Sequence, residues 1–215
     1  MTKSSKHILL SSICILPWVI AIVLSWYQST HNDTKDYNYE IYRSKIELKY
    51  YASKDAIIEA IDDYIDSIAP NSCLNGIALF EACEEYNIDI KFALAQGQLE
   101  SHFGTFGIAS KTNSVWNVLA YDGKTADEMI KNNQHYSHPD ESIKPYLELL
   151  AKDYLVKGKT EMDLMANFTN KFGKRYASSK TYENQLINIY KYINSSTTIQ
   201  YKYDIYKHYK ILSGK

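Results

Sequence analysis

The sequence has no excess of charge of either sign. Its 24 Lys and Arg residues are balanced by 25 Asp and Glu residues, which gives a formal net charge of −1 at pH 7. A chain this close to neutral creates no overall electrostatic field that would gather an anionic polymer around it. Nucleic acid is therefore not an expected partner.

Cysteine is scarce, and the spacing of the three residues excludes its common roles. Cys14 lies in an apolar run, and Cys73 and Cys83 would stand about 15 Å apart on one helix, too far for a disulfide. A disulfide would require Cys73 to precede that helix. His102 and His135 have no second ligand at helical spacing, and no zinc-type pattern occurs. We expect buried thiols, no metal and no cofactor.

A long apolar run stands near the start of the chain. Residues 8–27 are interrupted only by three serines and Pro17, and Lys3 and Lys6 precede them. About 20 apolar residues suffice to cross a bilayer, and basic residues in front favour a cytoplasmic N-terminus. Residues 1–27 are therefore predicted to form an anchor in the inner (cytoplasmic) membrane, with the rest exported to the periplasm or cell-wall side. A cleaved signal peptide is the alternative, although residues 23–25 make a poor cleavage site.

Hydrophobic periodicity divides the remainder into a linker, a helical domain and a tail. Residues 28–52 are polar and rich in tyrosine, which indicates a stalk or a loosely helical juxtamembrane linker. Apolar residues recur at helical spacing through residues 53–196, with Ser53 as the first predicted N-cap. Residues 105–140 lack this period and contain turn residues, which predicts an irregular lobe with one hairpin. The tail, residues 197–215, is expected to be a strand or mobile.

One carboxylate stands out at a predicted helix end. Phe92, Ala95 and Leu99 make an apolar stripe, and Gly104 suits the left-handed residue that ends many helices. Glu100 then lies in the last turn, where the helix dipole and a small, partly apolar niche disfavour a negative charge. A carboxyl group in such a place has the raised pKa that a general acid requires. The alternative is a solvated glutamate at a fraying helix end.

Four segments, in order along the chain, resemble the bacterial cell-wall endo-β-N-acetylglucosaminidases. They are residues 93–105 (ALAQGQLESHFGT), 110–118 (SKTNSVWNV), 136–143 (YSHPDESI) with Tyr146 following, and 175–182 (RYASSKTY). Two departures are Leu119, where related sequences often have glycine, and residues 178–180, which replace a Thr-Asp-Pro. The resemblance implies a mainly α fold of the lysozyme-like α+β type: a helical domain with a small irregular or β lobe after the catalytic helix, preceded by one N-terminal transmembrane helix.

The resemblance also implies roles for individual residues. Glu100 would protonate the departing glycosidic oxygen, and Tyr176 would face this acid. Phe103 and Trp116 are candidates for the aromatic floor of a saccharide cleft, or for packing under the lobe. Asn117 would bind a substrate hydroxyl or amide, or fix its own loop. Tyr136, in the third segment, would line the cleft edge or pack within the lobe.

Glycosidases usually pair the acid with a second carboxylate. The lobe and its surroundings offer five, and spacing cannot choose among them: Asp122, Asp127, Glu128, Asp140 and Glu141. Asp122, beside Gly123, is the first candidate, although an Asp-Gly pair is also a common turn. An N-acetylglucosamine substrate can instead use its own 2-acetamido oxygen.

Taken together, these features predict a membrane-anchored hydrolase that cuts peptidoglycan strands at the β-1,4 bond after N-acetylglucosamine. A lytic transglycosylase would act on the same polymer and leave an anhydro sugar. A wall-binding module that keeps the fold without catalysis is the alternative from a different class.

Overall fold

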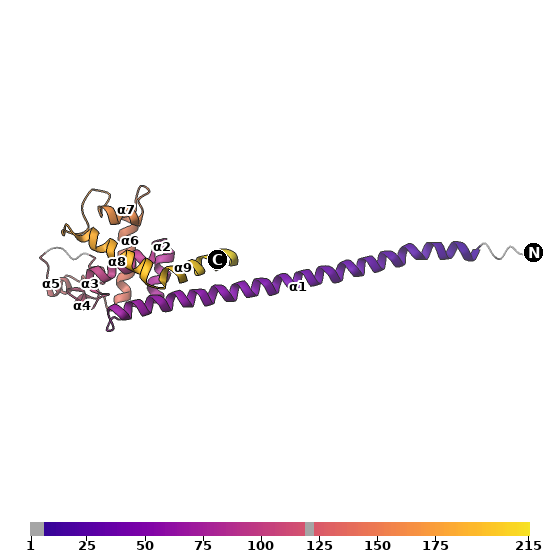
Figure 1. Ribbon diagram of the computed structural model, residues 1–215, viewed down its shortest axis with the longest axis horizontal. Coiled ribbons are helices and arrows are strands. Elements are labelled where there is room, and N and C mark those ends of the chain that lie inside the picture. Colours follow the sequence, from indigo (N-terminus) through magenta and orange to yellow (C-terminus); the bar gives the residue numbers. More distant parts are fainter. Residues whose placement is uncertain (1–6, 119–122) are drawn as a thin grey trace, which may run out of the picture. The chain divides into compact units, whose positions relative to one another are not determined.

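The computed structural model describes residues 7–118 and 123–215, with side chains described from residue 18 onward except at 30–35. Within these residues the chain is mainly helical and has no strand (Figure 1). Extended pairing is limited there to one isolated antiparallel bridge, between Thr169 and Arg175. The mainly α fold class is therefore confirmed.

The helices are listed here with their bounds: α1 (His7–Ile68), α2 (Gly76–Tyr86), α3 (Ile90–Ser101), α4 (Ala109–Thr112), α5 (Ala126–Lys131), a 3₁₀ helix η1 (Pro139–Ser142), α6 (Ile143–Leu149), a π-helical turn η2 (Leu150–Tyr154), α7 (Glu161–Ala166), α8 (Tyr182–Ser196) and α9 (Ile199–Ser213). They divide into two compact units. One consists of Met1–Tyr51 and Tyr209–Lys215, and the other, called the main unit below, of Ala52–His208.

Helix α1 is longer than the sequence pattern predicts. It runs without interruption through residues 28–52 and through Ser53, so the predicted cap at Ser53 is wrong. No glycine or proline occurs between Pro17 and Pro70, so nothing in this stretch breaks a helix once it has begun. Helix α1 ends at Ile68, just before Pro70, which disfavours further helical winding.

The predicted transmembrane helix is not confirmed. Among the residues whose side chains are described, no helix combines the length and the apolar character that crossing a bilayer requires. Residues 8–17 of the predicted anchor lie outside this set.

The tail is a helix, which corrects the expectation of a strand or a mobile end. Within the main unit, the phenols of Tyr203 and Tyr206 donate hydrogen bonds to the two carboxylate oxygens of Glu84, at 3.0 and 3.1 Å. The ring of Tyr206 also packs edge-on against Phe80, with 5.1 Å between centroids. Residues three apart share one face of a helix, so helical winding lets both tyrosines reach α2.

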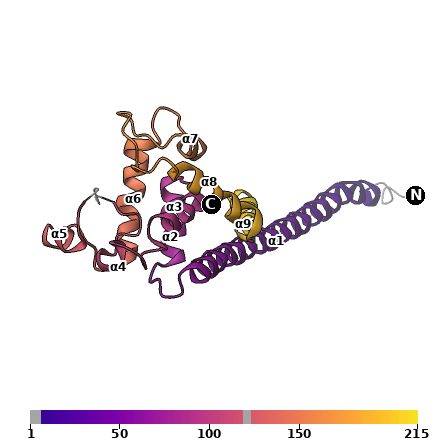
Figure 2. The same cartoon turned by 60° about the vertical axis from the view of Figure 1, so that its left-hand side comes forward.

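Helix α3 is the centre of the main unit. Every residue from Ile90 to Gly97 is buried, rather than only the stripe that the sequence predicts. A helix that is buried all round needs small residues where neighbours approach closely, and Ala93, Ala95 and Gly97 fill this need. Helix α3 packs against α8 and α2 (Figure 2).

Gly97 makes room for two large rings. A Cβ atom placed there would lie 3.2 Å from Cδ1 of Phe103 and 3.3 Å from Nε1 of Trp116. Both rings are fully buried. The Trp116 ring stacks on Tyr146 at 4.4 Å and donates its Nε1–H to the carbonyl of Ala93, so it cannot move aside cheaply.

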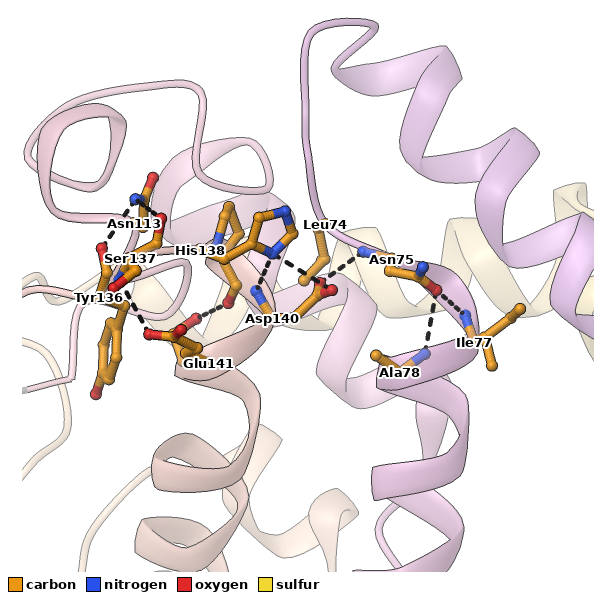
Figure 3. A network of polar contacts seen from close by, with 12 residues as sticks. Leu74, Asn75, Ile77, Ala78, Asn113, Tyr136, Ser137, His138, Asp140 and Glu141 are labelled. Atoms are coloured by element: carbon orange, nitrogen blue, oxygen red, sulfur yellow. Dashed lines mark hydrogen bonds and ion pairs between the residues drawn. The ribbon is translucent and has the colours of Figure 1, made fainter.

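The segment after α3 is irregular, but the described part of it holds no strand or hairpin, so the β lobe is not observed. It contains α4, α5 and η1 joined by turns. Figure 3 shows how polar contacts attach this lobe to α2. Asp140 Oδ1 accepts a hydrogen bond from the backbone N–H of Asn75 at 2.8 Å, and Asn75 Oδ1 caps α2 by accepting from Ile77 and Ala78.

The sequence predicts a helix that begins with a capping box of Thr160 and Asp163 and ends at Gly173. The capping box is confirmed, but helix α7 ends at Ala166. In a continuous helix Phe168 and Phe172 would lie on the same face. Because the helix ends earlier, the two side chains lie in different environments. Phe168 is fully buried and Phe172 is 80% exposed. Cys83 is buried as expected, whereas Cys73 is exposed; both are free thiols.

Gly97→Ala should lower the free energy of unfolding. Overpacking a filled core costs about 1–3 kcal/mol, whereas alanine gains about 1 kcal/mol of helix propensity over glycine. We expect a net loss of about 1 kcal/mol, measured by thermal or urea unfolding. A stabilised variant would show that Phe103 and Trp116 have room to shift.

Candidate active site

Glu100 lies in the last turn of α3, as the sequence predicts, and its side chain is partly exposed. His102 takes the left-handed conformation that ends the helix, with φ 46°, and Phe103 and Gly104 continue it at φ 54° and 85°. The chain therefore turns away directly after Glu100. Burial raises the pKa of the Glu100 carboxyl, and hydrogen bonds from Tyr182 and Asn117 lower it by less.

Two side chains hold the carboxyl group, one on each oxygen. The phenol of Tyr182 donates to Oε1 at 2.5 Å. The amide of Asn117 donates to Oε2 at 3.2 Å and to the backbone carbonyl of Glu100 at 3.1 Å. Since both oxygens accept a hydrogen bond, the orientation of the carboxyl plane is fixed from two sides.

Tyr182 is itself held by a chain of hydrogen bonds through the core. Gln96 Nε2 donates to the Tyr182 oxygen at 3.1 Å, and Gln96 Oε1 accepts from the phenol of Tyr146 at 2.8 Å. Gln96 and Glu100 are one turn apart on α3, so the same helix carries the carboxyl group and the anchor of its partner. Burial raises the pKa of both phenols well above its ordinary value, so both remain donors.

Tyr176 lies close to Glu100 without a hydrogen bond to it. Its phenol donates to the backbone carbonyl of Trp116 at 2.9 Å, and its ring stacks on Phe168 with 4.6 Å between centroids. Burial raises its pKa, and the neighbouring charge of Glu100 adds to this. The ring centroid of Tyr182 lies 5.8 Å away. Tyr176 thus lines the same cleft as Glu100, and its hydroxyl group is bound to the loop that contains Trp116.

Glu100 opens onto a cleft of about 800 Å³ in the main unit. Its walls come from the lobe, from η2 and from the loop between α7 and α8. The described residues that line it are Glu100, Gly107, Ile108, Asn117, Val118, Gly123, Lys124, Leu149, Asp153, Tyr154, Asn170, Lys174, Arg175, Tyr176, Ala177 and Ser178. A concave site with a few convergent polar groups suits a small part of a larger ligand.

Asp153 is the second carboxylate among the described residues of the cleft wall. It belongs to η2, a π-helical turn, and such turns often occur at functional sites. Its Oδ1 pairs with Lys171 Nζ at 2.8 Å, and its backbone carbonyl accepts the N–H of Lys171 at 2.7 Å. Asp153 is therefore neutralised by a lysine and holds the neighbouring loop.

Three of the candidate substrate contacts do not line the cleft, which favours their alternative role in packing. Phe103 and Trp116 are both fully buried and do not line the cleft, because Gly97 lets them pack beneath α3. Tyr136 belongs to the network of Figure 3, where its backbone carbonyl accepts from Asn113 at 2.9 Å, and it too is absent from the cleft wall. Asn117 does line the cleft, and there it binds Glu100.

The predicted second carboxylates are placed elsewhere or lie outside the described residues. Asp122 is in the latter group. Glu128 closes the capping box of α5, Asp140 binds Asn75, and Glu141 accepts the N–H of Ser137. None of these three lines the cleft, and neither does Asp127.

Three residues of the site have no distinctive pattern in the sequence. Tyr182 and Tyr154 fit the apolar face of a helix, and Asp153 belongs to no motif. The available signal was the end of the fourth resembling segment, where Tyr176 and Tyr182 stand six residues apart. Among the described residues, no three His, Cys, Asp or Glu side chains form a group that would hold a metal ion.

Comparison with known proteins gives one match. Residues 77–195, more than half of the chain, match the model of the family Glucosaminidase, described as mannosyl-glycoprotein endo-beta-N-acetylglucosaminidase. Neither the curated proteins nor the solved structures gave a match. The matched range begins in α2, ends in α8 and includes Glu100, Asn117, Tyr176 and Tyr182. The chain therefore belongs to the glucosaminidase family and is a glycoside hydrolase, and the partly buried carboxyl group of Glu100 opens onto a cleft inside the matched range.

Proposed function

We propose that the protein is a peptidoglycan hydrolase that cleaves the β-1,4 bond after N-acetylglucosamine, with Glu100 as the general acid. The observation that carries this proposal is the state of Glu100. Burial raises the pKa of the carboxyl group that opens onto the cleft, which favours the protonated form needed to donate a proton. Membership of the glucosaminidase family supports the substrate class.

In the first step the proton of Glu100 passes to the glycosidic oxygen as the bond between this oxygen and the sugar C1 breaks. Tyr182 and Asn117 keep the carboxyl group in one orientation while the proton leaves, and they stabilise the carboxylate that results. Water then attacks C1 and returns a proton to Glu100. The acid is thus restored at the end of each turnover.

The positive charge that develops on the sugar needs a second group. Asp153 lines the cleft, but its pairing with Lys171 reduces its negative charge and ties it to the loop. Asp122 remains a sequence-based candidate. We favour the 2-acetamido oxygen of the substrate itself, which acts in this way in other glycosidases. Tyr176 would then form the wall beside the reacting sugar.

Glu100→Gln should keep the fold and lower the rate of cell-wall hydrolysis by about 10²–10⁴-fold, because a side-chain amide cannot donate the proton. Glutamine retains an oxygen that can accept from Tyr182. The raised pKa of Glu100 means that ionisation of this carboxyl group lowers stability as pH rises above its unfolded pKa. This gain offsets the loss of the oxygen that accepts from Asn117, so the variant should be about as stable as the parent at neutral pH. Retained turnover of purified peptidoglycan would refute the role of Glu100.

Mass spectrometry of the released fragments identifies the reaction. A reducing N-acetylglucosamine end is expected. An anhydro sugar would instead assign a lytic transglycosylase, and bound but uncut glycan would assign a wall-binding module.

Tyr182→Phe should shift the alkaline limb of the pH–activity profile to higher pH. A general acid is active only while protonated, so activity falls as pH rises through its pKa. The hydrogen bond from Tyr182 lowers this pKa, and removing it lets burial raise the pKa further. Tyr176→Phe is the matched control, since the phenol of Tyr176 bonds to Trp116 and not to Glu100. NMR titration of labelled Glu100 measures the same shift in pKa. An alkaline limb that does not move would show that Tyr182 does not influence the pKa of the acid.

Residues 8–27 are proposed to anchor the enzyme in the cytoplasmic membrane, with the main unit on the cell-wall side. Their apolar character and the preceding lysines support this. Deleting these residues should move the protein from the carbonate-resistant membrane pellet to the supernatant. If the intact chain is itself extracted by carbonate, the anchor is excluded.

A further inference from the structure

A tight turn beside the cleft, residues 169–175, holds its backbone in one shape. The N–H of Asn170 donates to the carbonyl of Lys174 at 2.9 Å, and that of Gly173 donates to the carbonyl of Asn170 at 2.9 Å. The side-chain oxygen of Asn170 accepts from the N–H groups of Phe172 and Lys174, at 3.0 and 2.9 Å. Gly173 has φ 79°, a conformation that glycine adopts without strain.

The same turn is fastened to the cleft wall. Lys171 binds Asp153 through both its backbone N–H and its ammonium group, and the ammonium also donates to the carbonyl of Lys152 at 3.3 Å. Asn170 and Lys174, on either side of the tip, themselves line the cleft that holds Glu100. The tip is thus a fixed extension of the wall.

Phe172 stands at this tip with its ring 80% exposed, the largest exposed fraction of any large apolar side chain among the described residues. The Lys171 ammonium lies over the ring, 5.2 Å from its centroid. This ammonium also binds Asp153, which lines the cleft, so Lys171 connects the ring to the cleft wall. The rest of the ring faces solvent. An apolar ring that is exposed on a fixed turn buries little surface, so it contributes little to the stability of the fold.

We propose that Phe172 is a sugar-stacking subsite for a part of the glycan strand that extends beyond the cleft. A pyranose ring presents a face of C–H groups that packs on an aromatic ring, and its hydroxyl groups suit the polar side chains around the tip. The substrate of the proposed function is a polymer, whereas the cleft of about 800 Å³ receives only a short stretch of it. This inference rests on the proposed function and adds the means by which a long strand is held.

An exposed aromatic ring beside lysines also suits a membrane surface. Two observations favour the glycan. The turn is continuous with the cleft wall on both sides of Phe172, and Lys171 is already paired with Asp153.

The test compares binding of chitohexaose and chitobiose, β-1,4 oligomers of N-acetylglucosamine, to the 215-residue chain in detergent by calorimetry. Phe172→Ala should weaken chitohexaose binding about tenfold, the size of one good aromatic contact, and leave chitobiose binding unchanged. Phe172→Trp should retain it. Tyr201→Ala is the matched control, because Tyr201 is an exposed aromatic residue (69%) on α9 that does not line the cleft.

The outcomes separate this inference from the proposed function. If the parent binds chitohexaose and Phe172→Ala binds it equally well, the subsite is wrong and the hydrolase proposal stands. If the parent neither binds nor cuts either oligomer or peptidoglycan, both proposals fall. If Phe172→Ala instead loses only its binding to vesicles of anionic phospholipid, measured by flotation of chains that lack residues 8–27, the tip is a membrane contact and the glycan subsite is overturned.

Discussion

The hydrogen bond between Tyr182 and Glu100 is the contact on which the rest of the site depends. It joins the end of the central helix α3 to the start of α8, and Gln96 and Tyr146 continue it into the core. Buried polar groups are costly unless each one finds its partner, so this chain specifies how the four side chains are arranged. The acid is therefore positioned by the packed interior, while the loops around it shape only the space that the substrate enters.

The core also explains why two large rings near Glu100 in the sequence do not line the cleft. Gly97 leaves room for Phe103 and Trp116, and both rings are fully buried. Burial of the Glu100 carboxyl group itself raises its pKa. The side chains that line the cleft with Glu100 come from later segments of the chain and include Asn117, Asp153 and Tyr176.

Features that depend on residues close together in the sequence were predicted better than contacts between residues far apart in it. Glu100 in the last turn of α3 followed from apolar spacing and from Gly104, both within a few residues. The partner Tyr182 could not be found in this way, because it is 82 positions away and its apolar ring fits a core face equally well. Spacing also misled at Phe172: four residues after Phe168 matches a helix, but Asn170 and Gly173 form a turn instead.

The π-helical turn η2 fits one more residue into the cleft wall than an α-helix would. An α-helix advances about 100° per residue, and a π-helical turn accommodates an additional residue within one such turn. Asp153 and Tyr154 reach the cleft from this wider turn. Because the wider turn absorbs the additional residue, the chain beyond it keeps the direction that an uninterrupted α-helix would give it. The cleft wall therefore gains a residue while the segments that follow stay in register.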